Sequence, residues 1–129
     1  MDFNRELYFE IEGNCIVKKN QYKYTRKGGK TWGYKPKNVV DFNESALWQI
    51  KTQLGKYTKT VLPIYGEVSV YLVFEIAGRD KDLDGVTTTI YDILQQSEVI
   101  KNDSQITMAE QVKTLEKPED ITHIYIKEL

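Results

Sequence analysis

A strictly alternating segment, followed at once by an amphipathic helix, constrains the fold of this chain most. Residues 67–78 alternate in side-chain type, and the apolar set is Val68, Val70, Leu72, Phe74 and Ile76. A period of two predicts a strand with one buried face. After a short polar connection, residues 84–96 carry apolar side chains at helical spacing, namely Val86, Ile90, Ile93 and Leu94. We therefore expect a strand that leads directly into a helix, with Asp84 at the helix N-cap.

Three weaker patterns occupy the N-terminal half. Residues 7–16 mix β-forming residues with a Gly13-Asn14 turn signal, which predicts a hairpin or an edge strand. The basic segment that follows is expected to form two short strands or two extended pieces around Gly28-Gly29. A capping pattern at residues 41–44 precedes a helical apolar stripe that ends at Gly55.

Two further strands are predicted at residues 104–113 and 122–127, separated by the turn-forming residues 117–120. The whole chain, residues 1–129, is therefore expected to form one α+β domain. Its sheet should be mixed and mostly antiparallel, with two main helices.

Composition excludes several classes of protein. A hydrophobic content of 40% and a charged content of 29% are typical of globular proteins. No apolar run approaches the roughly 20 residues that span a bilayer, and the first ten residues do not resemble a secretory signal. The single cysteine, Cys15, and the single histidine, His123, make a zinc site implausible. We expect neither to be catalytic, and we expect a cytoplasmic location without membrane attachment.

The net charge of −1 hides a strongly uneven distribution. Residues 14–40 contain eight cations and no acid: Lys18, Lys19, Lys23, Arg26, Lys27, Lys30, Lys35 and Lys37. Such a segment favours contact with nucleic-acid phosphates, although surface lysines commonly have no binding role. The interspersed Trp32 and Tyr34 could stack on unpaired bases, and packing in a core or interface is an equal alternative.

The acids gather elsewhere, in and around the helix that follows the clearest strand. Asp82-Leu83-Asp84 stands at its start, and Asp103 follows its end. Carboxylates brought together need a counter-ion, and Mg²⁺ or Mn²⁺ prefers such oxygen ligands. These acids therefore indicate a metal site and phosphodiester chemistry. The competing interpretation is that Asp82 and Asp84 only cap a helix, and Asp92 is more simply a solvated charge.

Over residues 68–106 the chain resembles the RusA family of Holliday-junction resolvases. The resemblance rests on the strand, on Asp82-Leu83-Asp84, on a helix with Tyr91-Asp92, and on Asn102-Asp103-Ser104-Gln105. It implies that Asp82, Asp84 and Asp103 are the catalytic, metal-binding aspartates. It also matches Gln105 and Asp92 to a glutamine and an acid of the family pattern.

The resemblance further implies a RusA-like fold, Mg²⁺ dependence with Mn²⁺ as a substitute, and a homodimer that resolves branched DNA in recombination and repair. Family members are often encoded by phages or prophages of a bacterial host. The chain departs from the family pattern at two positions: Gly85 replaces an asparagine and Thr88 replaces the catalytic lysine. Because threonine cannot replace a cation, Lys81, Lys101 and Arg79 become candidates to supply the missing charge.

Two other functions stay open. One is a catalytically impaired, RusA-like module that binds branched DNA without cutting it. The other is a protein-interaction domain in which the acids form only a structural cation site.

Overall fold

The computed structural model describes residues 6–17, 23–27, 30–34, 37–57 and 60–129. A four-stranded sheet has the order β1-β6-β4-β5. Its strands are β1 (Glu6–Glu12), β4 (Val68–Glu75), β5 (Ile106–Thr114) and β6 (Ile121–Glu128). Strand β6 is antiparallel to both β1 and β4, whereas β4 and β5 are parallel. The predicted α+β class and the mixed, mostly antiparallel sheet are confirmed.

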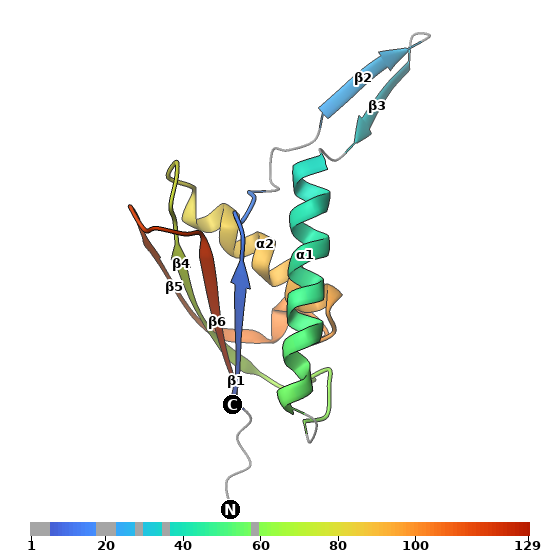
Figure 1. Cartoon of the computed structure of the whole chain (residues 1–129). Coiled ribbons are helices and arrows are strands. Elements are labelled where there is room, and N and C mark those ends of the chain that lie inside the picture. Colours follow the sequence, from blue (N-terminus) through green and yellow to red (C-terminus); the bar gives the residue numbers. More distant parts are fainter. Residues whose placement is uncertain (1–5, 18–22, 28–29, 35–36, 58–59) are drawn as a thin grey trace, which may run out of the picture.

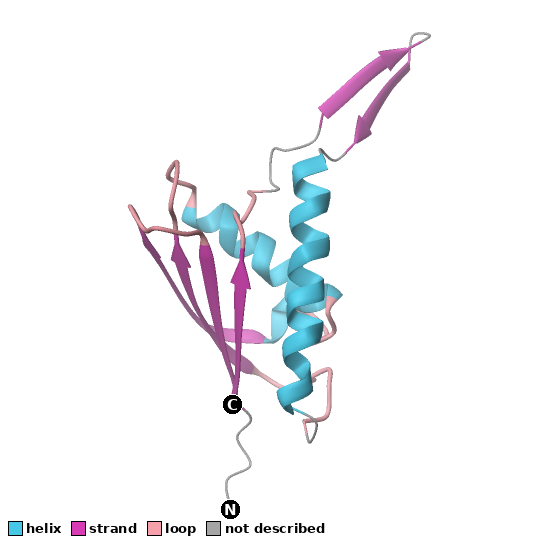
Figure 2. Ribbon diagram, in the orientation of Figure 1, coloured by secondary structure: helices cyan, strands magenta, loops and turns pink. Residues whose placement is uncertain are grey.

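Two helices, α1 (Lys37–Gln53) and α2 (Leu83–Gln96), lie on one side of this sheet (Figure 2). The alternating burial of β4 explains this arrangement, because Val68, Val70, Leu72 and Phe74 are almost wholly buried. They pack in one core with the apolar faces of both helices, including Ile50 of α1 and Ile90 of α2. Burial of these side chains is the main stabilising contribution to the fold.

None of the described helices covers the opposite face of the sheet, which is rich in tyrosine. The ring centroids of Tyr8 and Tyr125 are 4.8 Å apart, and those of Tyr71 and Tyr125 are 5.6 Å apart. His123 lies beside them, with Nδ1 2.6 Å from the Tyr8 hydroxyl and Nε2 2.6 Å from Glu75 Oε2. This histidine is therefore half-buried and hydrogen-bonded at both ring nitrogens.

A two-stranded hairpin, β2 (Lys23–Lys27) and β3 (Lys30–Tyr34), extends away from the sheet beyond the start of α1 (Figure 1). The structure thus has two short strands in the basic segment, one of the two predicted alternatives, whereas Gly28-Gly29 lies outside the described residues. Strand β1 takes the edge position, one of the two predicted alternatives, and its only partner in the described sheet is β6.

The predicted start of the first helix was wrong. Helix α1 begins at Lys37, so the expected capping residues 41–44 lie inside it. The reason is tertiary: Val39 and Phe42 continue the buried stripe of Ala46 and Ile50 toward the N-terminus. Burial along one helix face outweighs a local capping signal. After Gln53 the chain tightens into the 3₁₀ turn η2 (Leu54–Tyr57), which contains the predicted stop at Gly55.

Two smaller predictions need correction. The N-cap of α2 is Asp82 and not Asp84, because Asp82 has the extended backbone and accepts the capping hydrogen bond. Cys15 is buried, but it follows β1 and does not belong to a strand. None of the described helices has the length and apolarity needed to cross a bilayer.

Candidate metal centre and nucleic-acid interface

Two exposed aspartates stand on the first turn of α2. Asp82 is the N-cap, and its Oδ2 accepts a hydrogen bond from Gly85 N at 3.2 Å. Asp84 lies within the first helical turn. The helix dipole and the free N–H groups of this turn stabilise negative charge here. One turn further, Thr88 donates its hydroxyl to the carbonyl of Asp84 at 3.0 Å.

Asp103 begins the 3₁₀ turn η3 (Asp103–Gln105), which lies between α2 and β5. A reciprocal capping box fixes this turn: Asn102 Oδ1 accepts from Ser104 N, and Gln105 Oε1 accepts from Asn102 N. The Asp103 carboxylate is exposed. Burial raises the pKa of Tyr91 on α2, and the charge of Asp103 is a smaller contribution in the same direction.

The three aspartates do not come together within one chain. Helix α2 has 14 residues and is therefore about 21 Å long, with Asp82 and Asp84 at its start and Asp103 beyond its end. Among the described residues, no group of three acidic, histidine or cysteine side chains is close enough to hold a metal ion. The expected three-carboxylate site is thus not formed by a single copy of this chain.

The donor set still fits a hard cation. Asp82 and Asp84 offer exposed carboxylate oxygens, the ligand type that Mg²⁺ binds together with water. Asp92 is half-buried and lies two turns after Asp84 on the same side of α2, toward Asp103. Asp92 therefore lies along the helix between Asp82 and Asp84 at its start and the turn of Asp103 after its end.

The loop before α2 is held by two lysines. Lys113 on β5 donates to Asp80 Oδ1 at 2.8 Å and to the carbonyl of Lys81 at 2.9 Å. The hydrogen bond from Lys113 holds the pKa of Asp80 below its usual value. Lys81 donates to the carbonyl of Cys15 at 2.8 Å, and its burial lowers the pKa of its ammonium. Sequence reasoning missed these contacts, because Lys113 and Cys15 are far from the loop in the chain.

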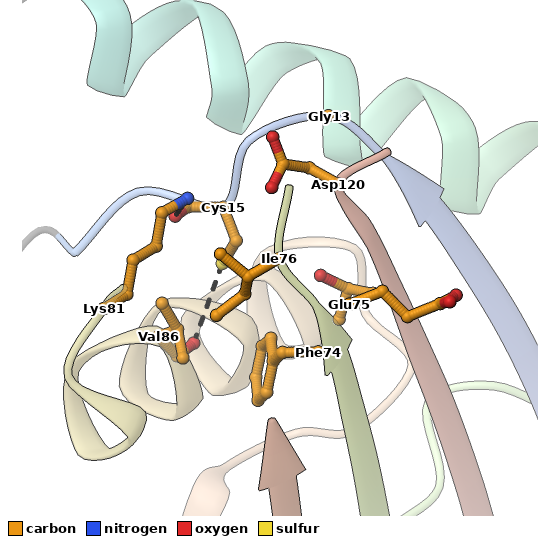
Figure 3. A pocket seen from close by; sticks show the side chains of 9 residues that line it. Gly13, Cys15, Phe74, Glu75, Ile76, Lys81, Val86 and Asp120 are labelled. Carbon is orange, nitrogen blue, oxygen red and sulfur yellow. Dashed lines mark hydrogen bonds between the residues drawn. The ribbon is translucent and has the colours of Figure 1, made fainter. Parts of the chain in front are cut away.

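A small cavity beside this loop is not a ligand site. Figure 3 shows Cys15, Lys81, Val86 and Asp120 around it, with the Cys15 thiol 3.9 Å from the carbonyl of Val86. Its volume of about 10 Å³ holds no more than one water molecule. The buried Cys15 is therefore a packing residue.

The basic residues form a separate feature. Lys23, Arg26, Lys27 and Lys30 belong to the projecting hairpin, in which Lys27 pairs with Lys30. Lys37 is the exposed first residue of α1. The other three predicted phosphate-binding residues, Lys18, Lys19 and Lys35, lie outside the described residues. The described part of the basic segment is thus an arm that extends from the body of the protein (Figure 1).

Comparison with known proteins identifies the family. A scan against models of protein families found no match. The chain is, however, 30% identical over 113 residues to the crossover junction endodeoxyribonuclease RusA of Aquifex aeolicus (strain VF5). The alignment covers 87% of this chain and 83% of that relative. The chain belongs to the RusA family.

The structure explains one of the two departures from the RusA pattern. A Cβ atom on Gly85 would lie 2.5 Å from Val17 Cγ1 and 3.3 Å from Asp82 Oδ2. Any side chain at this position would therefore collide with Val17 or disturb the capping aspartate. The packing of Val17 against the first turn of α2 therefore explains why glycine occupies position 85.

Within the part of the chain that the structure describes, no equally simple contact accounts for Thr88, which is exposed where the RusA pattern has lysine. The ammonium of Lys81 is hydrogen-bonded to Cys15 and not directed at the acids. Lys101 lies next to the turn that carries Asp103, at the other end of α2. Arg79 is exposed in the loop before α2. After Lys81, it is the cation nearest to Asp82 in the sequence, and it is therefore the remaining candidate.

Proposed function

We propose that this protein is a metal-dependent endonuclease that cuts branched DNA, as expected of a Holliday-junction resolvase. The observation that carries the proposal is the pair Asp82 and Asp84, exposed on the first turn of α2 in a chain that belongs to the RusA family. The related Aquifex protein carries the name of a crossover junction endodeoxyribonuclease.

Asp82 and Asp84 would hold Mg²⁺. The bound ion would supply Lewis-acid stabilisation of the phosphate and an activated water. The first turn of α2 fixes the orientation of both carboxylates, because Asp82 is tied to Gly85 N and the loop before it is tied to Lys113. The hairpin cations would neutralise DNA phosphates and orient the backbone toward this turn.

The position of Asp103 supports a homodimer. In one chain it lies beyond the far end of α2, but two copies of α2 packed antiparallel about a two-fold axis would bring Asp103 of each copy toward the first turn of the other. The route along the helix passes Thr88, Tyr91 and Asp92, which are exposed or half-buried. Such a dimer presents two identical sites, which suits the paired cuts of a four-way junction.

Cleavage of a labelled synthetic four-way junction, with linear duplex as control, tests the activity. Paired nicks at the branch in Mg²⁺ or Mn²⁺, absent in EDTA, are expected. Asp82→Asn or Asp84→Asn should abolish cleavage and leave junction binding largely intact, because amide and carboxylate have the same shape. Asp41→Asn, at an exposed carboxylate on α1, is the matched control. Cleavage at the parental rate by either of the first two variants would refute the metal assignment.

Subunit complementation tests the shared site. Asp84→Asn and Asp103→Asn chains, each inactive alone, are co-refolded. If Asp103 acts across the dimer, a mixed dimer contains one site with no substitution and nicks one strand. If each chain builds its own site, both sites of the mixed dimer are defective and the mixture stays inactive.

A second function, binding of branched DNA without turnover, is favoured by Thr88. Its hydroxyl is hydrogen-bonded to the helix backbone and it carries no charge for a developing phosphate anion. If the missing ammonium limits the rate, Thr88→Lys should raise cleavage. If the parent cleaves and Thr88→Lys cleaves at the same rate, another cation acts there. Arg79→Gln is then the next variant to measure.

The arm is tested separately through salt dependence. Lys27→Gln combined with Lys30→Gln should weaken binding to junction and duplex alike and lower the slope of log affinity against log salt by about two. An unchanged slope would show that these lysines do not contact phosphate.

A further inference from the structure

The side chain of Gln105 ties the turn that carries Asp103 to a loop about 40 residues upstream. Its Oε1 accepts hydrogen bonds from Lys101 N at 2.7 Å and Asn102 N at 2.8 Å. Its Nε2 donates to the carbonyls of Ile64 at 2.6 Å and Gly66 at 2.9 Å. An amide has two donors and two acceptor sites, so every one of them is used.

This arrangement fixes the backbone of Tyr65 from both sides. Ile64 is completely buried, its N–H donates to Val99 O at 2.9 Å, and it forms a parallel bridge with Ile100. On the other side, Gln105 holds the Gly66 carbonyl. The Tyr65 side chain is not enclosed by these contacts and is 70% exposed.

Tyr65 is therefore an aromatic ring presented to solvent from a rigid position. No hydrogen bond or ring stacking joins it to the rest of the described chain. Because Gln105 and Asp103 belong to the same three-residue turn, the loop of Tyr65 lies directly beside the turn of Asp103. An aromatic residue on a fixed backbone binds planar ligands with little further loss of conformational entropy.

We infer that Tyr65 is a nucleobase-binding residue that stacks on an unpaired base at the branch of the DNA. The inference rests on the proposed function, and it deepens it by naming how branched DNA is distinguished from duplex. In a continuous duplex the bases are stacked on one another and offer no free face, whereas a branch point exposes bases next to the phosphates to be cut. The ring would act through its face, so its hydroxyl is dispensable.

Alanine and phenylalanine substitutions separate the ring from the hydroxyl. Tyr65→Ala should weaken binding to a four-way junction, measured in EDTA, by between about fivefold and about 150-fold, the usual loss for one stacked base. Binding to linear duplex should not change. Tyr65→Phe should bind the junction within about twofold of the parent. Tyr125→Ala, on the sheet face without helices, is the matched control and should also bind as the parent does.

Junctions with 2-aminopurine at the branch give a second readout, because stacking of the probe on a tyrosine changes its fluorescence. The parent and Tyr65→Phe should produce that change, and Tyr65→Ala should not. Equal junction affinity of Tyr65→Ala and the parent, or an equal loss on junction and duplex, would overturn the inference. If the parent prefers and cuts the junction in that case, the proposed function stands. If the parent shows no preference for the junction, both fail.

Discussion

Replacing Gln105 by glutamate changes one atom type and breaks half of its hydrogen bonds. The carboxylate can still accept from Lys101 N and Asn102 N, so the cap of η3 survives. It cannot donate to Ile64 O or Gly66 O, and it places a negative oxygen against these two carbonyls. The substitution Gln105→Glu therefore loosens the upstream loop and leaves the turn of Asp103 capped.

The magnitude follows from the two lost bonds. Each hydrogen bond is worth about 0.5–1.5 kcal/mol, and the partly buried one to Ile64 leaves a carbonyl without its partner. We expect the free energy of unfolding to fall by about 2 kcal/mol at pH 7. With a urea m value of about 1–3 kcal/mol per molar, the unfolding midpoint should fall by roughly 1 M.

The effect should depend on pH with a definite sign. The two N–H groups that the introduced carboxylate keeps lower its pKa, and the two carbonyls that it faces raise it. Because only the protonated carboxyl can donate to a carbonyl, we expect the net result to be a folded-state pKa above the unfolded value. The folded variant therefore binds a proton more tightly than the unfolded variant does. The destabilisation is complete above the folded pKa and shrinks as the pH falls through it, because the protonated carboxyl can donate to Ile64 O again.

Urea unfolding of the parent and the variant at pH 7 and near pH 4 is the assay. The matched control is Gln111→Glu, since Gln111 donates to the Tyr91 hydroxyl at 3.1 Å and that hydroxyl can reverse its role. The control should change stability by less than about 0.5 kcal/mol. If Gln105→Glu unfolds at the parental midpoint at pH 7, the bonds to Ile64 and Gly66 do not hold the loop.

Three further predictions concern the rest of the fold. Gly85→Asn restores the family residue and should lower the free energy of unfolding by about 1–3 kcal/mol, measured by thermal or urea unfolding, because the added Cβ would collide with Val17. Combining it with Val17→Ala should recover most of that loss. Burial, followed by Glu10, Tyr125 and Glu75, raises the pKa of Tyr8 to about 12, so stability is full below pH 10 and decreases as the pH rises toward 12. Tyr8→Phe cannot ionise and should lose less stability over that range than the parent. Lys113→Met removes the hydrogen bond that lowers the pKa of Asp80, so the stability of the variant should decrease less steeply below pH 4 than that of the parent. Equal slopes of stability against pH below pH 4 would contradict this reasoning.

Periodic burial was predictable from the sequence, and contacts made by single side chains were not. The alternation in β4 and the stripe of α2 each sum several apolar side chains, so their signals exceed local noise. The start of α1 was misplaced because a capping motif uses only a few side chains, whereas Val39 and Phe42 are buried by elements elsewhere in the chain. The partners of Gln105 lie in an irregular loop without periodicity, so no pattern pointed to them.

The candidate site shows the same division between what is local and what is not. The spacing of Asp82, Asp84 and Asp103 was sufficient to predict the family, which a curated relative confirms. The same spacing could not tell whether the three carboxylates meet within one chain or between two. That question depends on α2: because about 21 Å of helix separates its first turn from η3, one copy keeps Asp103 away from the pair. The helix sets the separation between the pair at its start and η3 after its end, and the second copy that we propose would have to match that separation. A shorter or flexible connection would allow the acids of one chain to meet, so the length of α2 is itself an argument for a site completed by a second copy.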